Sequence, residues 1–263
     1  MDWGLYLALG AVAGLLAGLL GVGGGLIIVP ILAALFVQQG VSGDIIMHLA
    51  LGTSLASIVF TSLSSIRAHQ QHGAILWPAF RQLTPGILIG AACGGWLAGI
   101  MSTAWLKPLF AVFELAVGLH MLSSLKPQAQ RNLPGPIQMS SAGGVIGAVS
   151  SLVGIGGGTL TVPYLIWHSV NLRQAIATSS ACGFPIAVAG SLSFIVNGWY
   201  NTLLPTHSLG YVHLPALIGI AISSVLLAPL GARLTHRLPV AVLKKLFGGL
   251  LILLAVKLLI SEI

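Results

Sequence analysis

The sequence predicts an all-α polytopic membrane protein made of two repeats with inverted topology, each containing five apolar segments. Composition indicates the membrane class: the 263 residues include only 11 Lys or Arg and 4 Asp or Glu, whereas 56% are hydrophobic. A soluble domain of this length carries far more charge. Three long runs, 3–43, 132–172 and 174–232, contain no Asp, Glu, Lys or Arg. Each can cross the membrane at least twice, because one crossing needs about 20 apolar residues.

An internal duplication indicates the two repeats. Residues 21–30, GVGGGLIIVP, and residues 154–163, GIGGGTLTVP, are identical at six of ten positions. Three more pairs follow in the same order: 50–56 with 175–181, 73–79 with 210–216, and 106–110 with 243–247. We therefore expect a first transmembrane repeat at 1–125 and a second at 137–263. Between them, residues 126–136 are polar and rich in proline, as expected of a cytoplasmic linker.

Each repeat divides into five apolar segments. We expect those of the first repeat at 5–20, 26–37, 45–66, 83–101 and 106–124. Those of the second repeat are expected at 138–153, 159–168, 175–197, 214–233 and 240–261. The first two segments of each repeat are short, roughly 15–25 Å long as helices. They form either a full transmembrane hairpin or a re-entrant hairpin that turns back near the middle of the bilayer.

The charged residues predict the orientation. Because five is an odd number, the second repeat enters the membrane in the opposite sense to the first. If the chain reverses at every break, nine of the eleven basic residues share one side, which the positive-inside rule assigns to the cytoplasm. Four segments per repeat would instead divide them between the two sides. The nine are Arg67, Arg81, Lys126, Arg131, Arg173, Arg233, Arg237, Lys244 and Lys245.

The other side is then periplasmic or extracellular, and both chain termini lie on it. It holds Lys107 and Lys257 together with three acidic residues, Asp2, Asp44 and Glu262. Membrane sidedness accounts in this way for the net charge of +7, and no nucleic-acid partner is expected.

The two glycine-rich segments are the candidate binding site. Unwound backbone at membrane depth survives only where it is buried in protein or lines a wet cavity, because unpaired N–H and C=O groups are costly in hydrocarbon. A new helix begins after each glycine run, so free N–H groups and the positive end of a helix dipole face that cavity, which suits a small anion. The predicted binding residues are Gly23, Gly24, Gly25, Gly156, Gly157, Gly158 and Thr159. The alternative is that glycines only allow close helix packing, the interpretation preferred for the isolated Gly14 and Gly147.

Two hydroxyl pairs, Thr53–Ser54 and Thr178–Ser179, occupy matching positions of the repeats. Their hydroxyls are candidate donors to the same anion. The alternative is that they bond back to backbone carbonyls one turn earlier, which is common in membrane helices.

Glu114 is the only acidic residue well inside an apolar segment. An intramembrane carboxyl group is costly and is therefore a functional hypothesis by default. Glu114 is a candidate carrier of a coupling proton, and a structural hydrogen bond between helices is the alternative. Its counterpart in the second repeat is Leu251, so Glu114 is not one of the features that the two repeats share.

The size, the duplication and the paired GVGGG and GIGGG segments ending in Val-Pro resemble the TauE/SafE family, the sulfite exporter and toluene-sulfonate uptake permease family, over essentially the whole chain. The resemblance implies a bacterial inner-membrane carrier for sulfite, sulfoacetate or other sulfonates and sulfur oxyanions. The family is usually drawn with about eight spans. Ten segments agree with that number only if the hairpins are counted differently.

The expected function is secondary transport of a small sulfur-containing anion, with H⁺ or Na⁺ as the coupling ion and no cofactor. The sequence has no G-x-x-x-x-G-K-[ST] motif and no loop long enough for an ATPase domain, so an ion gradient has to supply the energy. An anion channel is the alternative, and proton or sodium dependence of the flux separates the two. An enzyme is not expected, because H-E-x-x-H and a convincing serine–histidine pair are absent.

Overall fold

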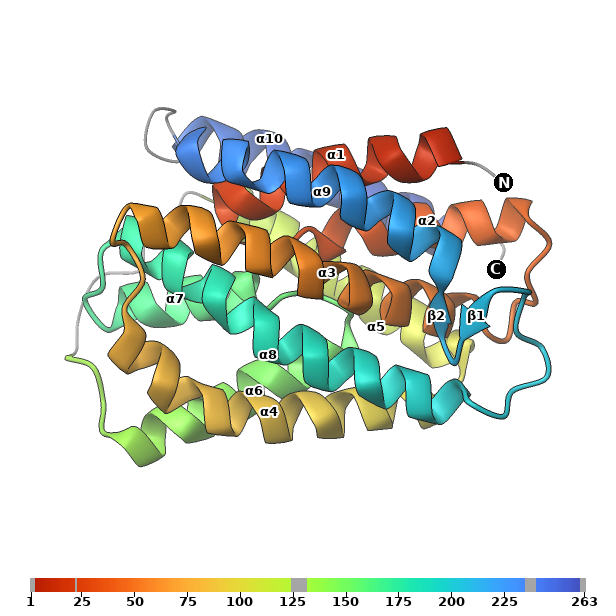
Figure 1. Ribbon diagram of the computed structural model, residues 1–263, viewed down its shortest axis with the longest axis horizontal. Coiled ribbons are helices and arrows are strands. Elements are labelled where there is room, and N and C mark those ends of the chain that lie inside the picture. Colours follow the sequence, from red (N-terminus) through yellow and green to blue (C-terminus); the bar gives the residue numbers. More distant parts are fainter. Residues whose placement is uncertain (1–2, 22, 124–131, 235–239, 261–263) are drawn as a thin grey trace.

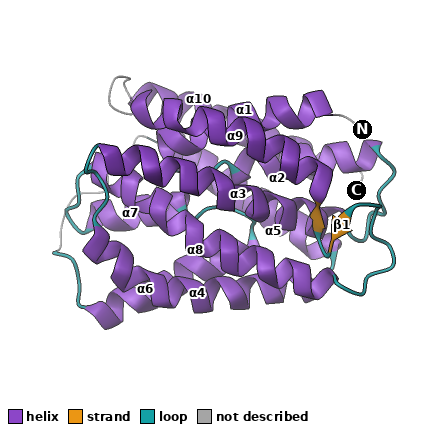
Figure 2. Cartoon of the chain, in the orientation of Figure 1, coloured by secondary structure: helices purple, strands orange, loops and turns teal. Residues whose placement is uncertain are grey.

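The computed structural model describes residues 3–21, 23–123, 132–234 and 240–260, and these form a helical bundle with one short β-hairpin (Figures 1 and 2). The helices of the first half are α1 (Trp3–Leu20), α2 (Gly25–Gln38), α3 (Ile46–Gln71), α4 (Trp77–Ile100) and α5 (Thr103–Leu122). Those of the second half are α6 (Pro136–Leu152), α7 (Gly158–Trp167), α8 (Leu172–Gly198), α9 (Leu214–Leu234) and α10 (Val240–Ile260). Strands β1 (Ser208–Leu209) and β2 (Val212–His213) pair antiparallel just before α9.

All ten predicted segments are helices, and their ends differ from the expected ones by a few residues. The largest differences are at the end of α3 and the start of α4, which extend to Gln71 and begin at Trp77. Both extensions contain polar residues, among them Arg67 and Arg81. Arginine, glutamine and lysine are good helix formers, so a helix continues into the polar boundary after the apolar pattern stops.

The two halves pack on each other in a reciprocal pattern. Helix α1 lies along α9, and its counterpart α6 lies along α4, while α3 packs on α8 and α5 on α10. Glycines allow the backbones to approach closely: a Cβ atom at Gly14 would lie 2.5 Å from the backbone of Ser224. A Cβ atom at Gly147 would likewise lie 2.5 Å from the carbonyl oxygen of Ile87. The packing interpretation of Gly14 and Gly147 is therefore confirmed.

Each half begins with a hairpin whose second helix runs back toward the end of the molecule where the first began (Figure 1). The Gln39 side-chain amide donates to the Tyr6 hydroxyl at 2.8 Å, which joins the end of α2 to the start of α1. In the second half, the Tyr164 hydroxyl lies 3.5 Å from the sulfur of Met139 and joins α7 to the start of α6. Helices α3 and α8, with 26 and 27 residues, run along the whole bundle, whereas α2 and α7 have only 14 and 10 residues.

Six of the described helices are long and apolar enough to cross a membrane: α1, α3, α4, α5, α8 and α9. The outer surface carries large hydrophobic residues, such as Trp105, which is 71% exposed, and Ile89, which is 69% exposed. Burying this apolar surface in lipid is favourable because it removes the surface from water. The chain is therefore a multi-pass membrane protein.

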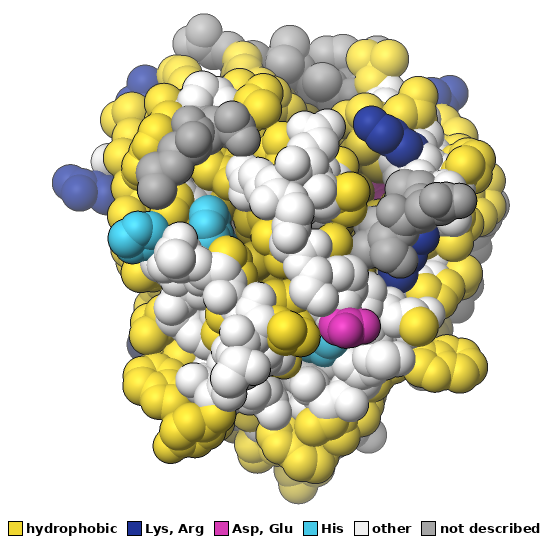
Figure 3. All heavy atoms as spheres, turned by 90° about the vertical axis from the view of Figure 1, so that its right-hand side faces the viewer, with side chains coloured by type: hydrophobic (Ala, Val, Ile, Leu, Met, Phe, Trp, Pro, Cys, Tyr) yellow, Lys and Arg dark blue, Asp and Glu magenta, His cyan; other side chains and the backbone are white. Residues whose placement is uncertain are grey.

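Charged residues separate between the two ends of the bundle. Arg67, Arg81, Arg173, Arg233 and Lys245 lie toward the end where α3 finishes and α4 begins, here called the basic end. Asp44, Lys107 and Lys257 lie toward the opposite end, where α1 begins and α10 finishes. Figure 3 looks onto the opposite end and shows hydrophobic side chains around its rim. Residues 126–131 of the expected linker, with Asp2, Arg237 and Glu262, lie outside the described residues.

Candidate substrate site at two broken helices

The two glycine segments meet in the middle of the bundle. A Cβ atom at Gly23 would lie 2.9 Å from the Cα of Gly156, so the breaks of the two halves touch. The same Cβ would lie 3.6 Å from Ile58, near the middle of α3, and one at Gly183, near the middle of α8, would lie 3.1 Å from the Gly156 carbonyl oxygen. Helices α2 and α7 therefore begin halfway along the two longest helices.

Glycine is required here by the backbone conformation. Gly24 and Gly157, the residues that precede α2 and α7, have left-handed φ values of 79° and 76°. Only glycine adopts this conformation freely, because it has no Cβ atom. The carbonyl oxygens of these two residues accept the first hydrogen bonds of the new helices, from Ile28 and Thr161 at 3.1 and 2.8 Å.

The beginnings of α2 and α7 supply hydrogen-bond donors to this region. The first N–H groups of a helix have no acceptor within it, and here they belong to Gly25, Leu26, Gly158 and Thr159. Each helix start also carries a partial positive charge of about half an elementary charge. Two such helix starts, brought together by the contact between Gly23 and Gly156, are suited to a small anion.

Two serines, one from each half, donate hydrogen bonds to the backbone at the glycine break of the other half. The Ser54 hydroxyl donates to the carbonyl oxygen of Gly154 at 2.8 Å. Its counterpart Ser179 donates to the carbonyl oxygen of Gly21 at 3.3 Å and to that of Ile176 at 2.9 Å. The serine of one half thus binds the backbone at the glycine break of the other half.

The threonines of the same pairs also form hydrogen bonds with the backbone of the other half. The Thr53 hydroxyl accepts a hydrogen bond from the N–H of His213 at 2.9 Å, just before α9. The Thr178 hydroxyl accepts from the N–H of Leu76 at 3.0 Å, just before α4. In this conformation the four hydroxyls of the two pairs bind backbone groups, and they fix where the long helices α3 and α8 stand relative to the other half.

The second half contributes three buried hydroxyls near its break, of which the sequence analysis predicted Thr159 and missed Thr161 and Ser150. Thr159, Thr161 and Ser150 have hydroxyl oxygens with no hydrogen-bond partner among the described residues. A Cβ atom at Gly157 would lie 3.3 Å from the Ser150 oxygen and 3.5 Å from the Thr161 oxygen, so both lie beside the start of α7. The corresponding residues of the first half are apolar: Leu26, Ile28 and Ala17. This difference between the repeats is the sequence feature from which these hydroxyls could have been predicted.

A small pocket adjoins the meeting point of the breaks and extends toward the basic end. It has room for about one water molecule. Its walls are Ala17, Gly21, Gly23, Ile58, Thr61, Ser62, Ser65, Gly156, Ser180 and Gly183. Neither threonine–serine pair lines it, so the hydroxyls of the pocket are different from the predicted ones.

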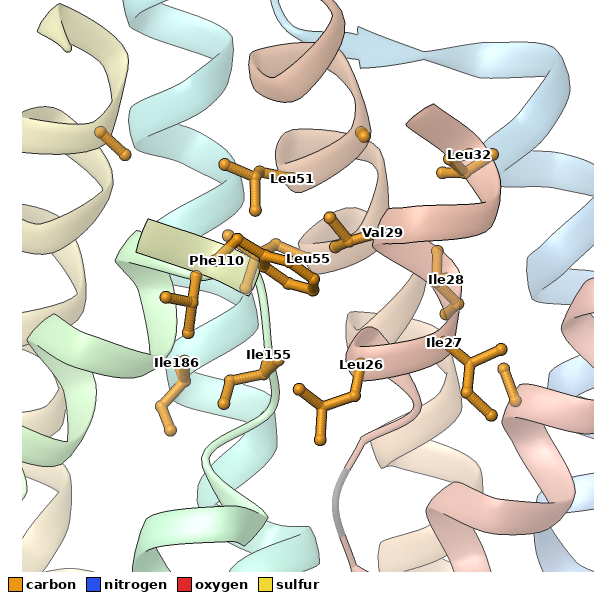
Figure 4. Close-up of a cluster of buried hydrophobic side chains, with 14 of the residues drawn as sticks. Leu26, Ile27, Ile28, Val29, Leu32, Leu51, Leu55, Phe110, Ile155 and Ile186 are labelled. Carbon is orange, nitrogen blue, oxygen red and sulfur yellow. The ribbon is translucent and has the colours of Figure 1, made fainter. Parts of the chain in front are cut away.

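A hydrophobic cluster occupies the other side of the breaks, toward the opposite end. Figure 4 shows Leu51, Leu55, Phe110, Ile155 and Ile186 gathered there, and all five are fully buried. Leu51 and Leu55 belong to the first half of α3, and Phe110 to the first half of α5. These buried side chains lie between the breaks and the opposite end.

Glu114 is fully buried on α5, and neither carboxyl oxygen has a hydrogen-bond partner among the described residues. It lies one turn after Phe110, a member of the hydrophobic cluster, and one turn before Gly118. A Cβ atom at Gly118 would lie 2.8 Å from the Ile252 side chain on α10. Glu114 therefore lies on the inner face of α5. In the described structure its carboxyl group makes no hydrogen bond to the glycine breaks or to the paired serines.

The fold and the site together define a polytopic helical membrane protein with two broken helices that meet at its centre. The family model "Sulfite exporter TauE/SafE" matches residues 6–258. The chain therefore belongs to the TauE/SafE family.

Several curated relatives carry the name "Probable membrane transporter protein". One from Haemophilus influenzae is 41% identical over 253 residues, which cover 96% of each chain. Another, from Methanocaldococcus jannaschii, is 29% identical over 89% of this chain and 86% of its own. The Bacillus subtilis protein YunE is 27% identical over 77% of this chain and 82% of its own. No solved structure matches the chain.

Proposed function

We propose that the protein is a secondary transporter that moves a small sulfur-containing anion, such as sulfite, sulfoacetate or another sulfonate, across the bacterial inner membrane. The observation that carries this proposal is the contact between the two glycine breaks, which brings two helix starts to one place halfway along the bundle. Broken helices at matching positions of two repeats are the best sequence pointer to a transport site.

The repeats are proposed to have inverted topology, with the basic end in the cytoplasm and both termini in the periplasm. The reciprocal packing of the halves and the position of the basic residues at one end support this arrangement. The two hairpins are proposed to be re-entrant. The helices that follow the breaks begin halfway along α3 and α8, and at 14 and 10 residues they measure about 21 and 15 Å, too short for a full crossing of about 30 Å.

A carrier is favoured over an anion channel because the space at the site is small and apolar side chains fill one side of it. The pocket at the breaks has room for about one water molecule, and Leu55, Phe110 and Ile186 fill the other side. A conducting pore needs a continuous wet path, whereas a carrier exposes its site to one side at a time.

Coupling is proposed to use a proton carried by Glu114. Its carboxyl group is enclosed without a partner, so its protonation has to change together with its access to water. Such linkage between protonation and conformation is what coupled transport requires.

The substrate class is tested by a binding screen of the purified protein against sulfite, thiosulfate, sulfoacetate and taurine. Isothermal titration calorimetry is suitable, with chloride as the reference anion. We expect saturable binding of at least one sulfur-containing anion at concentrations at which chloride gives no signal. Absence of binding to all four would reject the proposed substrate class.

A further inference from the structure

The pocket at the basic side of the breaks contains one hydroxyl that the fold leaves without a partner. Ser62 and Ser180 donate to the carbonyl oxygens of Val59 and Ile176, both at 3.0 Å. The Thr61 hydroxyl donates to the carbonyl oxygen of Ser57 at the same distance and also contacts the Ser224 hydroxyl at 2.7 Å. The Ser65 hydroxyl has no partner among the described residues, although only 2% of this residue is exposed. An unpaired buried hydroxyl is costly and therefore calls for an explanation.

The duplication provides an internal comparison for these hydroxyls. With 50–56 aligned on 175–181, Ser62 corresponds to Ala187 and Ser65 to Gly190. In the other direction, the counterpart of Ser180 is Leu55. Helices α3 and α8 are equivalent in their packing and in their threonine–serine hydrogen bonds. The same helix packing is therefore achieved without a hydroxyl at these positions, and packing does not account for Ser65.

The space that corresponds to the pocket on the other side of the breaks is filled. A Cβ atom at Gly190 would lie 2.5 Å from the Ser151 hydroxyl and 2.9 Å from the Leu55 side chain, so these two side chains occupy the region that a serine would face. Ile186, the counterpart of Thr61, extends to the start of α7, where a Cβ atom at Gly157 would clash with its tip. On the basic side of the breaks, a cavity and hydroxyl groups occur together.

We infer that this pocket is the cytoplasmic-side part of the substrate site and that the Ser65 hydroxyl donates a hydrogen bond to an oxygen of the anion. This inference rests on the proposed function and names a residue for it. The donors of the pocket are neutral, because no Lys, Arg or His lines it. Ser62 and Ser180 also line the pocket, but their hydroxyl protons are already donated to the carbonyl oxygens of Val59 and Ile176. The starts of α2 and α7 meet at its inner end, next to Gly23 and Gly156.

Binding requires the pocket to widen, because an oxyanion with several heavy atoms needs more room than one water molecule. Separation of α3 from α8 provides this room, since both helices contribute its walls. Neutral donors suit a carrier, which has to release the anion on the other side of the membrane. A site made of hydroxyl and N–H groups binds an anion without the strong ion pair that would retain it.

The test is the affinity of Ser65 variants for sulfoacetate, measured by isothermal titration calorimetry on purified protein. We expect Ser65→Ala to raise the Kd about tenfold or more, because it removes one hydrogen bond to a charged ligand. Ser65→Gly, which introduces the residue found at Gly190, should have the same effect. Ser64→Ala is the matched control: Ser64 is the adjacent residue, its hydroxyl donates to Val225 at 2.7 Å, and it is not part of the pocket. Monodisperse elution in detergent checks that each variant is assembled.

The possible results separate this inference from the proposed function. If the wild-type protein binds sulfoacetate and both Ser65 variants bind it with unchanged affinity, the pocket holds water only and the inference is wrong, while the proposed function stands. A Kd raised equally by Ser64→Ala would also reject a specific contact. If the wild-type protein binds neither sulfoacetate nor sulfite, thiosulfate or taurine, both the proposed function and the inference fail.

Discussion

Glu114 presents the clearest conflict between a residue and its surroundings. An uncompensated charge in this environment costs several kcal/mol. The residue is fully buried, and its carboxyl oxygens lack partners in the described chain. The sequence predicted the burial, because Glu114 stands in an apolar segment. It could not predict the missing partner, because partners come from helices that are distant in sequence.

Glu114→Gln tests the coupling proposal. The substitution keeps the shape and the hydrogen-bonding groups but removes the titration. We expect binding of the anion to change by less than about threefold and the stimulation of uptake by an imposed proton gradient to be lost. Uptake into proteoliposomes, with and without the gradient, measures this. If proton stimulation is the same in the variant and the wild type, Glu114 has only a structural role.

The serine and threonine pairs show what repetition in a sequence can and cannot predict. Their occurrence in both halves placed Thr53, Ser54, Thr178 and Ser179 near the site. Their acceptors and donors, such as the carbonyl oxygen of Gly154 for Ser54, belong to the other half of the chain. No local pattern contains that information, because it depends on how the halves dock.

At the scale of elements, the glycine breaks determine where α2 and α7 begin. All ten helices could be predicted from runs of apolar residues, and the breaks from the two glycine clusters. The extensions of α3 and α4 into polar residues and the short strands β1 and β2 were not predicted. The helices that pack together were not predictable either, because α1 contacts α9 across nearly the whole length of the sequence.

Gly24→Ala and Gly157→Ala test whether these breaks bind the anion. Alanine at a left-handed position costs about 1–2 kcal/mol, so we expect a lower melting temperature in detergent for both variants. We also expect the Kd for the anion to rise at least tenfold in protein that still elutes as a single species, because the added Cβ atom disturbs the N–H groups at the helix start.

The control for these variants is Gly4→Ala. A Cβ atom at Gly4 would have nothing within 4 Å, whereas one at Gly14 would meet the backbone of Ser224 and disturb the packing of α1 on α9. Gly4→Ala should leave both affinity and stability nearly unchanged. If the two break variants assemble and bind with wild-type affinity, the glycines serve packing alone and the anion binds elsewhere.

At the scale of the whole molecule, the arrangement of the two halves predicts the membrane topology. The start of α1 and the end of α10 lie at the end opposite the basic residues. We expect a reporter that is active only in the cytoplasm to be inactive when fused to the C-terminus. The same reporter fused after Arg233, at the basic end, should be active. An active C-terminal fusion together with an inactive one after Arg233 would reverse the proposed orientation.

Transport by alternating access is the central claim, and counterflow tests it most directly. Proteoliposomes are loaded with an unlabelled sulfur-containing anion that the binding screen has identified, and a trace of the labelled anion is added outside. Equal potassium on both sides with valinomycin holds the membrane potential at zero, so that label cannot accumulate in response to voltage. We predict a transient accumulation of label above its equilibrium level, because a carrier that returns with substrate exchanges one anion for another. Label that rises only to equilibrium, with no overshoot, would contradict the carrier mechanism and indicate a channel.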